Sequence, residues 1–236
     1  MNIKGFMQYF LEQRRERGHQ RMAKRFLALG IMVWALMPLG MAAQAALLSP
    51  RDIVLETSQR VLAALKDQQV SPADNPEYFY HLANELIVPH FDFGRMSRRV
   101  LGKHWRQATK EQQLDFVTQF RQLLVRTYVT ALHKYSTEDI RSFLKERIKV
   151  LPVNLPPEAT RVSVKVQVES ENGGPPINIA LNLYLNQEKN WKVEDVQVEG
   201  VSLVTNYRAT FYREIRVGGI QGLIDKLTSR NQHAMK

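Results

Sequence analysis

The segment 191–222 constrains the fold more than any other part of the chain. Apolar residues alternate along its first third, which is typical of a strand with one buried face, and an amphipathic helix follows directly after Gly200. The apolar residues fall at odd positions before Glu194 and at even positions after Asp195, and such a change of phase predicts a β-bulge. We expect the bulge and the glycine turn to set the helix at an angle to the sheet, so that the two enclose a wedge.

Two more alternating segments precede this one. Residues 161–169 alternate without a fault, and residues 177–185 form the next apolar face. The segment 172–176, Asn-Gly-Gly-Pro-Pro, predicts a turn between them. Residues 148–153 are a candidate fourth strand. The sequence therefore predicts a curved, mostly antiparallel sheet of about four strands.

The first half of the chain predicts helices, so the fold class is α+β, with an N-terminal helical half packed on the sheet and C-terminal helices after it. Start signals stand at Ser49-Pro50 and Asn75-Pro76, and Thr109 to Gln112 forms a capping box. Glycines at 218, 219 and 222 predict a break in the last helix. The other expected helices cover 50–69, 76–88, 92–101, 110–135 and 138–145.

The N-terminus is typical of a secretory signal peptide. A basic region precedes the uncharged apolar run 26–41, and a small-residue site ends at Ala45, so we expect cleavage after residue 45. A membrane anchor is the alternative, but the run is 16 residues long and contains Pro38, which is short for a span. The basic region is unusually long, and Met22 is a candidate for the true start.

Removal of residues 1–45 changes the charge of the chain. The formal charge of +10 falls to +5, because this segment holds 7 basic and 2 acidic residues. Half of the net positive charge therefore lies in the expected targeting segment. An exported protein is not expected to bind nucleic acid. There is no cysteine, so residues 46–236, expected to form a single domain in a monomer, must be held together by their core.

Residues that could perform chemistry are sparse. The five histidines after residue 45 are not spaced as metal ligands, so we expect no metal site. Ser202 partly resembles a nucleophile elbow, but a helix N-cap fits an antiparallel sheet better. A basic cluster with Trp105 beside it predicts either a solvated face or a docking patch for anionic partners or lipid headgroups; its members are Arg95, Arg98, Arg99, Lys103 and Arg106.

Several of these motifs together resemble the MlaC family, also called the toluene-tolerance auxiliary-protein family. They are Leu101-Gly102 before Trp105-Arg106, the long helix with its aromatic residues, VEGVSLVTNYRATF at 198–211 and GGIQGLIDKL at 218–227. The resemblance covers roughly residues 50–230. It implies a cone-shaped, NTF2-like fold with an internal apolar cavity, in a periplasmic carrier of glycerophospholipid.

The resemblance also implies partners and a pathway. Family members carry lipid between an outer-membrane lipoprotein–porin complex and an inner-membrane ABC transporter with MCE domains, and so maintain the lipid asymmetry of the outer membrane. The glycerophospholipid is cargo, and no cofactor is expected.

Sixteen residues are candidates for the lipid-binding site. The sheet would form one wall and two helices the other, with Arg208 contacting the headgroup or lying at the rim; a salt bridge is the alternative for this arginine. The candidates are Leu124, Tyr128, Val164, Val166, Ile179, Leu181, Leu183, Trp191, Val193, Val196, Val198, Val201, Leu203, Tyr207, Arg208 and Phe211.

Two other functions fit the same α+β scaffold. One is a small exported enzyme that acts on an apolar substrate, for which no acid–base pair stands out in the sequence. The other is a scaffold with a filled core and no ligand, because periodicity alone does not separate a filled core from a pocket.

Overall fold

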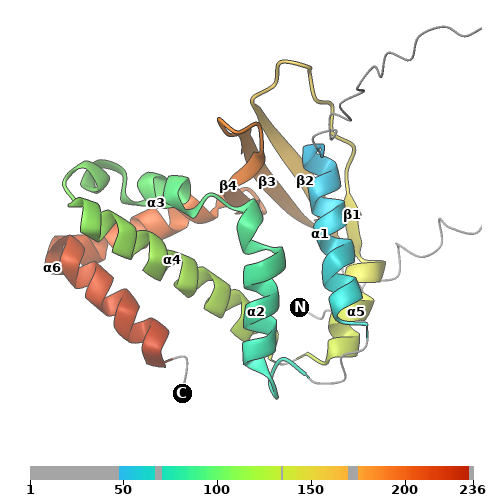
Figure 1. Cartoon of the computed structure of the whole chain (residues 1–236), viewed down its shortest axis with the longest axis horizontal. Coiled ribbons are helices and arrows are strands. Elements are labelled where there is room, and N and C mark those ends of the chain that lie inside the picture. Colours follow the sequence, from blue (N-terminus) through green and yellow to red (C-terminus); the bar gives the residue numbers. More distant parts are fainter. Residues whose placement is uncertain (1–47, 67–70, 134, 170–174, 234–236) are drawn as a thin grey trace, which may run out of the picture.

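The structure is a computed structural model that describes residues 48–66, 71–133, 135–169 and 175–233. It confirms the α+β class: helices pack against a five-stranded sheet, with α1 and α5 beside β1 and β2, and α3, α4 and α6 grouped beyond β4 (Figure 1). The helices are α1 (Pro50–Ala64), α2 (Pro76–Leu86), α3 (Phe93–Leu101), α4 (Lys110–Ala131), α5 (Thr137–Glu146) and α6 (Leu203–His233), with 3₁₀ turns η4 (Val88–His90) and η5 (Gly102–Arg106).

The helix starts follow the capping signals of the sequence. Ser49 accepts a hydrogen bond from the backbone of Asp52, and Thr109 forms the predicted capping box. The predicted ends of α1 and α4 were too late. Helix α4 ends at Ala131 because the next backbone N–H groups bond to carbonyls three residues back, which tightens the last turn. Helix α1 ends at Ala64, before the segment 67–70 that lies outside the described residues.

The sheet is antiparallel throughout, in the order β1-β2-β3-β4-β5. The register places Leu181 between Val164 and Val196. The candidate fourth strand is confirmed as a short edge strand, whereas the fifth was not predicted, because two residues carry no periodic signal. The strands are β1 (Ile148–Val150), β2 (Arg161–Val168), β3 (Ile177–Leu185), β4 (Trp191–Val198) and β5 (Val201–Ser202).

The predicted bulge in β4 is confirmed. Asn182 pairs with Asp195 and the next residue of β3, Leu183, pairs with Val193. Glu194 is therefore the extra residue of β4 and has no partner on β3. The break in the last helix is also confirmed, because Gly219 has a positive φ of 67° inside α6.

The buried apolar residues form three clusters rather than one continuous core. The helical cluster joins α3, α4 and α6 around Phe116, Phe120 and Phe211. The sheet cluster lies on the apolar face of β2, β3 and β4, where α1 packs against it. The third cluster joins α1, α2, α4 and α5 around Phe79. Phe91 packs against both the helical and the sheet cluster, so it links the two walls of the expected wedge.

Gly102 gives a stability prediction. It ends α3 with a φ of 52°, and an added Cβ would meet the hydroxyl of Tyr212. We expect Gly102→Ala to lower the free energy of unfolding by about 1–3 kcal/mol, measured by urea denaturation. Gly218→Ala is the matched control, because a Cβ there meets nothing within 4 Å and its φ is not positive. Equal stability of the two variants would contradict this account.

Candidate functional site

The bulge in β4 places two carboxylates inside the protein. Asp195, which is 2% exposed, accepts hydrogen bonds from the hydroxyl of Ser202 (2.7 Å) and the backbone N–H of Val204 (3.1 Å). Ser202 in turn accepts one from the backbone of Thr205 (3.1 Å), so its predicted role as the N-cap of α6 is confirmed. The carboxylate at the bulge thus fixes the start of α6 against the sheet.

Glu194, the second carboxylate, binds three arginines from two elements. Arg95 of α3 donates to it directly, Arg99 of α3 lies 3.9 Å away and donates to its backbone carbonyl at 3.0 Å, and Arg161 of β2 lies 3.4 Å away. These contacts tie α3 to the sheet at the bulge. The sequence singled out the arginines of α3, but their partner lies about a hundred residues away and no local signal indicates it.

The sheet residues among the lipid-binding candidates lie on one apolar face, but their exposure differs along it. At one end Leu183 is 1% exposed, while Leu181 and Val196 in the middle are half-buried. At the other end Val198 is 44% and Val201 64% exposed. The sheet cluster contains Val164, Val166, Ile179, Leu181, Leu183, Trp191, Val193 and Val196. An apolar face that opens in this way offers surface to a ligand.

The helix candidates are similarly divided between buried and open positions. Leu124 and Phe211 belong to the helical cluster, and Leu203 and Tyr207 pack against it. Tyr128 of α4 is 54% exposed. Partial burial raises the pKa of the hydroxyls of Tyr128 and Tyr207 above the ordinary value, and the charge of Tyr207 adds to the shift at Tyr128.

Arg208 contacts backbone rather than a carboxylate. Its guanidinium donates to the carbonyl of Arg99 (2.9 Å from Nε), at the C-terminal end of α3. A cation at this end of a helix is favourable, so the contact contributes to joining α6 to α3. The alternative of a salt bridge is not what the geometry shows, and the headgroup contact stays a prediction.

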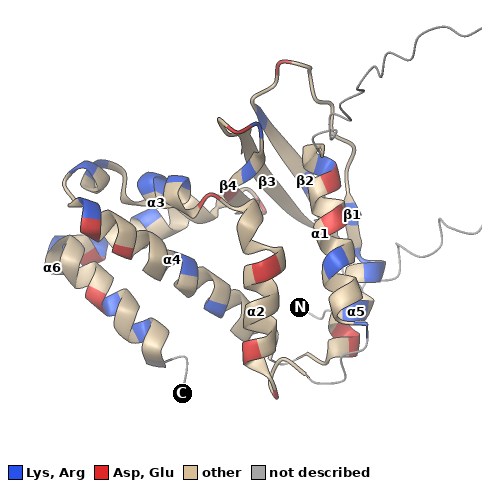
Figure 2. Cartoon of the chain, in the orientation of Figure 1, with Lys and Arg blue, Asp and Glu red and all other residues tan. Residues whose placement is uncertain are grey.

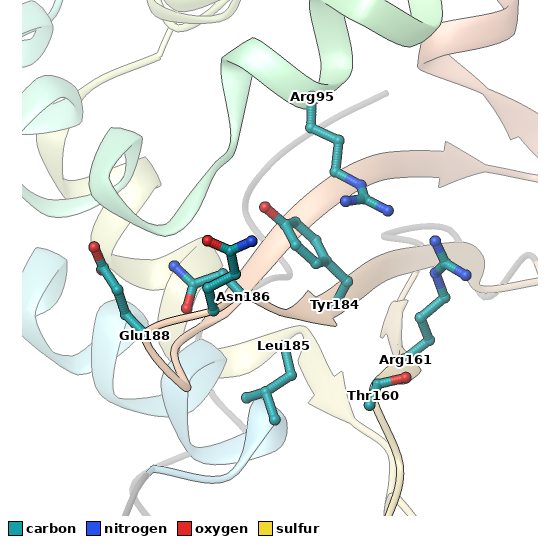
Figure 3. Close-up of a pocket in the computed structure, with 8 residues that line it drawn as sticks. Arg95, Thr160, Arg161, Tyr184, Leu185, Asn186 and Glu188 are labelled. Carbon is teal, nitrogen blue, oxygen red and sulfur yellow. The ribbon is translucent and has the colours of Figure 1, made fainter.

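Three pockets surround the N-terminal end of α3, and none is lined by the sixteen candidates. One of about 520 Å³ is drawn in Figure 3 and includes Arg95, Arg161 and Tyr184. A second, of about 770 Å³, shares Arg95 and Arg161, and a third, of about 310 Å³, lies beside Lys192. The predicted apolar cavity is not among these three pockets and stays a prediction.

Tyr184 gives a prediction for alkaline pH. Its hydroxyl donates to Asp92, and burial together with this hydrogen bond raises its pKa to about 12. The raised pKa favours the folded state below pH 10, and this contribution disappears between pH 10 and 12. We expect Tyr184→Phe to remove a tyrosinate absorbance transition centred near pH 12; an unchanged titration curve would contradict the assignment.

The described residues contain neither a cluster of metal-ligating side chains nor a helix suited to span a membrane. Within them, no group of three or more His, Asp or Glu side chains is placed to hold a metal ion. None of the helices in this part of the chain combines the length and hydrophobicity needed to span a bilayer. The predicted signal peptide, residues 1–45, lies outside the described residues.

The amino-acid sequence of the chain is similar to a known protein family over most of its length. The family model of the MlaC protein matches residues 55–229. The chain belongs to the MlaC family. The toluene tolerance protein ttg2D of Pseudomonas putida is 29% identical over 165 residues, 69% of this chain and 71% of the relative. The intermembrane phospholipid transport system binding protein MlaC of Haemophilus influenzae is 23% identical over 180 residues, covering 76% and 80%.

A solved structure extends the MlaC resemblance to three dimensions. It is the phospholipid-binding protein of Ralstonia solanacearum in complex with a phospholipid. The two chains superpose with a TM-score of 0.65 and share 29% identity, over 79% of this chain and 98% of that one. The family predicted from the sequence is thus confirmed, and its fold is the one found here.

Proposed function

We propose that the protein binds glycerophospholipid, with the acyl chains against the apolar face of the sheet and the facing surfaces of α4 and α6. The observation that carries the proposal is the partial exposure of apolar residues on both sides, at Leu181 and Val196 on the sheet and Tyr128 on α4. The phospholipid complex of the Ralstonia relative, which has the same fold, supports it.

The energetics of lipid transfer explain why such a protein needs apolar walls and no catalytic group. A diacyl lipid has about 30 methylenes. At ~0.8 kcal/mol each, exposing its tails to water costs a free energy on the order of 20 kcal/mol. Only contact with a long apolar surface offsets this cost. The sheet cluster and its open end offer such a surface along β3 and β4.

The expected signal peptide supports a location in the periplasm, where the carrier would exchange lipid with membrane complexes. We propose the partners that the family resemblance implies: an outer-membrane lipoprotein–porin complex and an inner-membrane ABC transporter with MCE domains. The protein would carry phospholipid between them and so maintain outer-membrane asymmetry. It would bind the lipid unchanged and not act as an enzyme.

Extraction of the purified protein tests the proposal. The protein should be expressed with its leader, purified without detergent, extracted with organic solvent and analysed by mass spectrometry. We expect intact phospholipid at near one molecule per chain. Hydrolysed lipid in its place would favour the enzyme, and a protein that yields no lipid and takes none up from vesicles would favour the scaffold.

A further inference from the structure

A groove lined by arginines lies on the polar side of the sheet. The pockets of about 520 and 770 Å³ share Arg95 and Arg161, so they adjoin at these two side chains, between α3 and the strands β2, β3 and β4, and the two together are called the groove. Arg161 and Tyr184 alternate with Val162 and Leu183 along their strands and therefore lie on the opposite face from the apolar cluster. The groove therefore shares only Leu185, at the end of β3, with the sheet cluster proposed for the lipid tails.

Positive charge exceeds negative charge in this groove. The larger pocket is lined by Arg95, Arg98, Arg99 and Arg161, against Asp92 and Glu194, and the smaller pocket adds Glu188, so four guanidiniums face three carboxylates. Figure 2 shows the concentration of basic residues on α3 and the turn after it. Two further exposed cations, Lys103 and Arg106, follow in η5. Glu194 is shared by three guanidiniums and Asp195 lies 3.8 Å from one of them, Arg99, whereas neither carboxylate forms an ion pair with Arg98.

Aromatic rings position the guanidiniums at the groove. Arg95 lies over the ring of Tyr184, 4.0 Å from its centroid, and Arg98 lies 6.0 Å from the centre of Trp105. Arg98 is exposed, and no carboxylate of the described residues lies within ion-pair distance of it. A preorganised guanidinium without a carboxylate partner binds an incoming carboxylate without first breaking a salt bridge.

We propose that this groove is a docking site for an acidic peptide segment of a partner protein. Its two adjoining pockets are larger than one phosphate needs, and the exposed cations Arg98, Lys103 and Arg106 offer partners for the repeated carboxylates of an extended chain. A membrane surface fits less well, because the guanidiniums line a hollow rather than a protruding face. The docking site does not depend on lipid binding, since it occupies the other face of the sheet.

Peptide binding tests this proposal on the full mature protein. The probe is a fluorescein-labelled decapeptide rich in Asp and Glu, with a matched peptide in which Asn and Gln replace them, followed by fluorescence anisotropy. We expect saturable binding of the acidic peptide alone. Arg98→Glu should weaken it at least about tenfold, and Arg98→Lys by much less.

Arg60→Glu is the matched control, because Arg60 is exposed on α1, away from the groove, and the change in net charge is the same. It should alter the affinity less than about twofold if the groove itself binds the peptide. Equal weakening by the two variants, or no saturable binding, would overturn the proposal. Vesicles containing phosphatidylglycerol form the last arm: binding that depends on Arg98 there, without peptide binding, would assign the surface to membranes.

The lipid content of the Arg98→Glu variant distinguishes the proposal of lipid binding from the proposal of peptide docking. We expect the variant to retain phospholipid at the wild-type level while it loses the peptide. Loss of both would mean that the groove and the apolar face are not independent, which would contradict the separation on which the docking site is based.

Discussion

Leu181→Asp is expected to reduce co-purifying phospholipid to less than about a tenth of the wild-type amount, measured by extraction and mass spectrometry. Leu181 lies at the centre of the apolar face, between Val164 and Val196, and is half-buried. An ionised carboxylate there would have to lie among acyl chains without a partner. Binding of the tails would then cost several kcal/mol more, enough to lose the lipid.

The partial exposure of Leu181 is what keeps this variant interpretable. Val166→Arg would place a charge at a position that is 5% exposed, and this would unfold the protein as readily as it would remove the bound phospholipid. In the ligand-free fold the carboxylate at 181 retains access to water, so we expect the circular dichroism spectrum to persist.

Ser163→Asp is the matched control for Leu181→Asp. Ser163 is exposed on β2 and pairs with Asn182, one residue along from the Val164–Leu181 pair. It points to the opposite face, so the same charge should leave the lipid content unchanged. A folded Leu181→Asp protein with an undiminished lipid content would show that the acyl chains do not bind to this face of the sheet.

The sequence predicted what depends on local periodicity and capping. Alternation in β2 and β3, the change of phase at Glu194 and the capping box at Thr109 each correspond to an observed feature. These signals are strong because a position on the buried face of a strand, or in the first turn of a helix, restricts the residue types that fit there. The family resemblance came from several such motifs together, of which the strand that leads into α6 is one.

What the sequence did not predict depends on contacts between distant residues. Periodicity placed Leu183 and Val198 on the same face of the sheet. Leu183 is buried and Val198 is exposed because other elements cover one end of this face and not the other. Arg208 was predicted to contact a headgroup or lie at the rim, which stays a prediction, but its contact with the carbonyl of Arg99 was not predicted, because it joins residues more than a hundred positions apart. The same holds for Glu194, whose burial against three arginines no strand pattern indicates.

Asp195→Ala is the stability prediction with the largest expected effect. The variant leaves the buried N–H of Val204 and the hydroxyl of Ser202 without their acceptor and removes the carboxylate 3.8 Å from Arg99. Because hydrogen bonds to a buried charged group are worth about 1.5–3 kcal/mol each, and Arg99 is partly screened by water, we expect a loss of about 3 kcal/mol. Urea denaturation measures it.

Asp225→Ala is the control, because this exposed aspartate of α6 accepts a hydrogen bond from the side chain of Gln221, one turn earlier in the helix. The variant should change stability by less than about 0.5 kcal/mol. Asp195→Asn separates shape from charge: an amide oxygen still accepts from Val204, but Arg99 loses the carboxylate at 3.8 Å and keeps only that of Glu194 at 3.9 Å. If Asn restores most of the stability, the carboxylate acts mainly as an acceptor for the start of α6. If it does not, the charge on the bulge is what joins the sheet to α3 and α6.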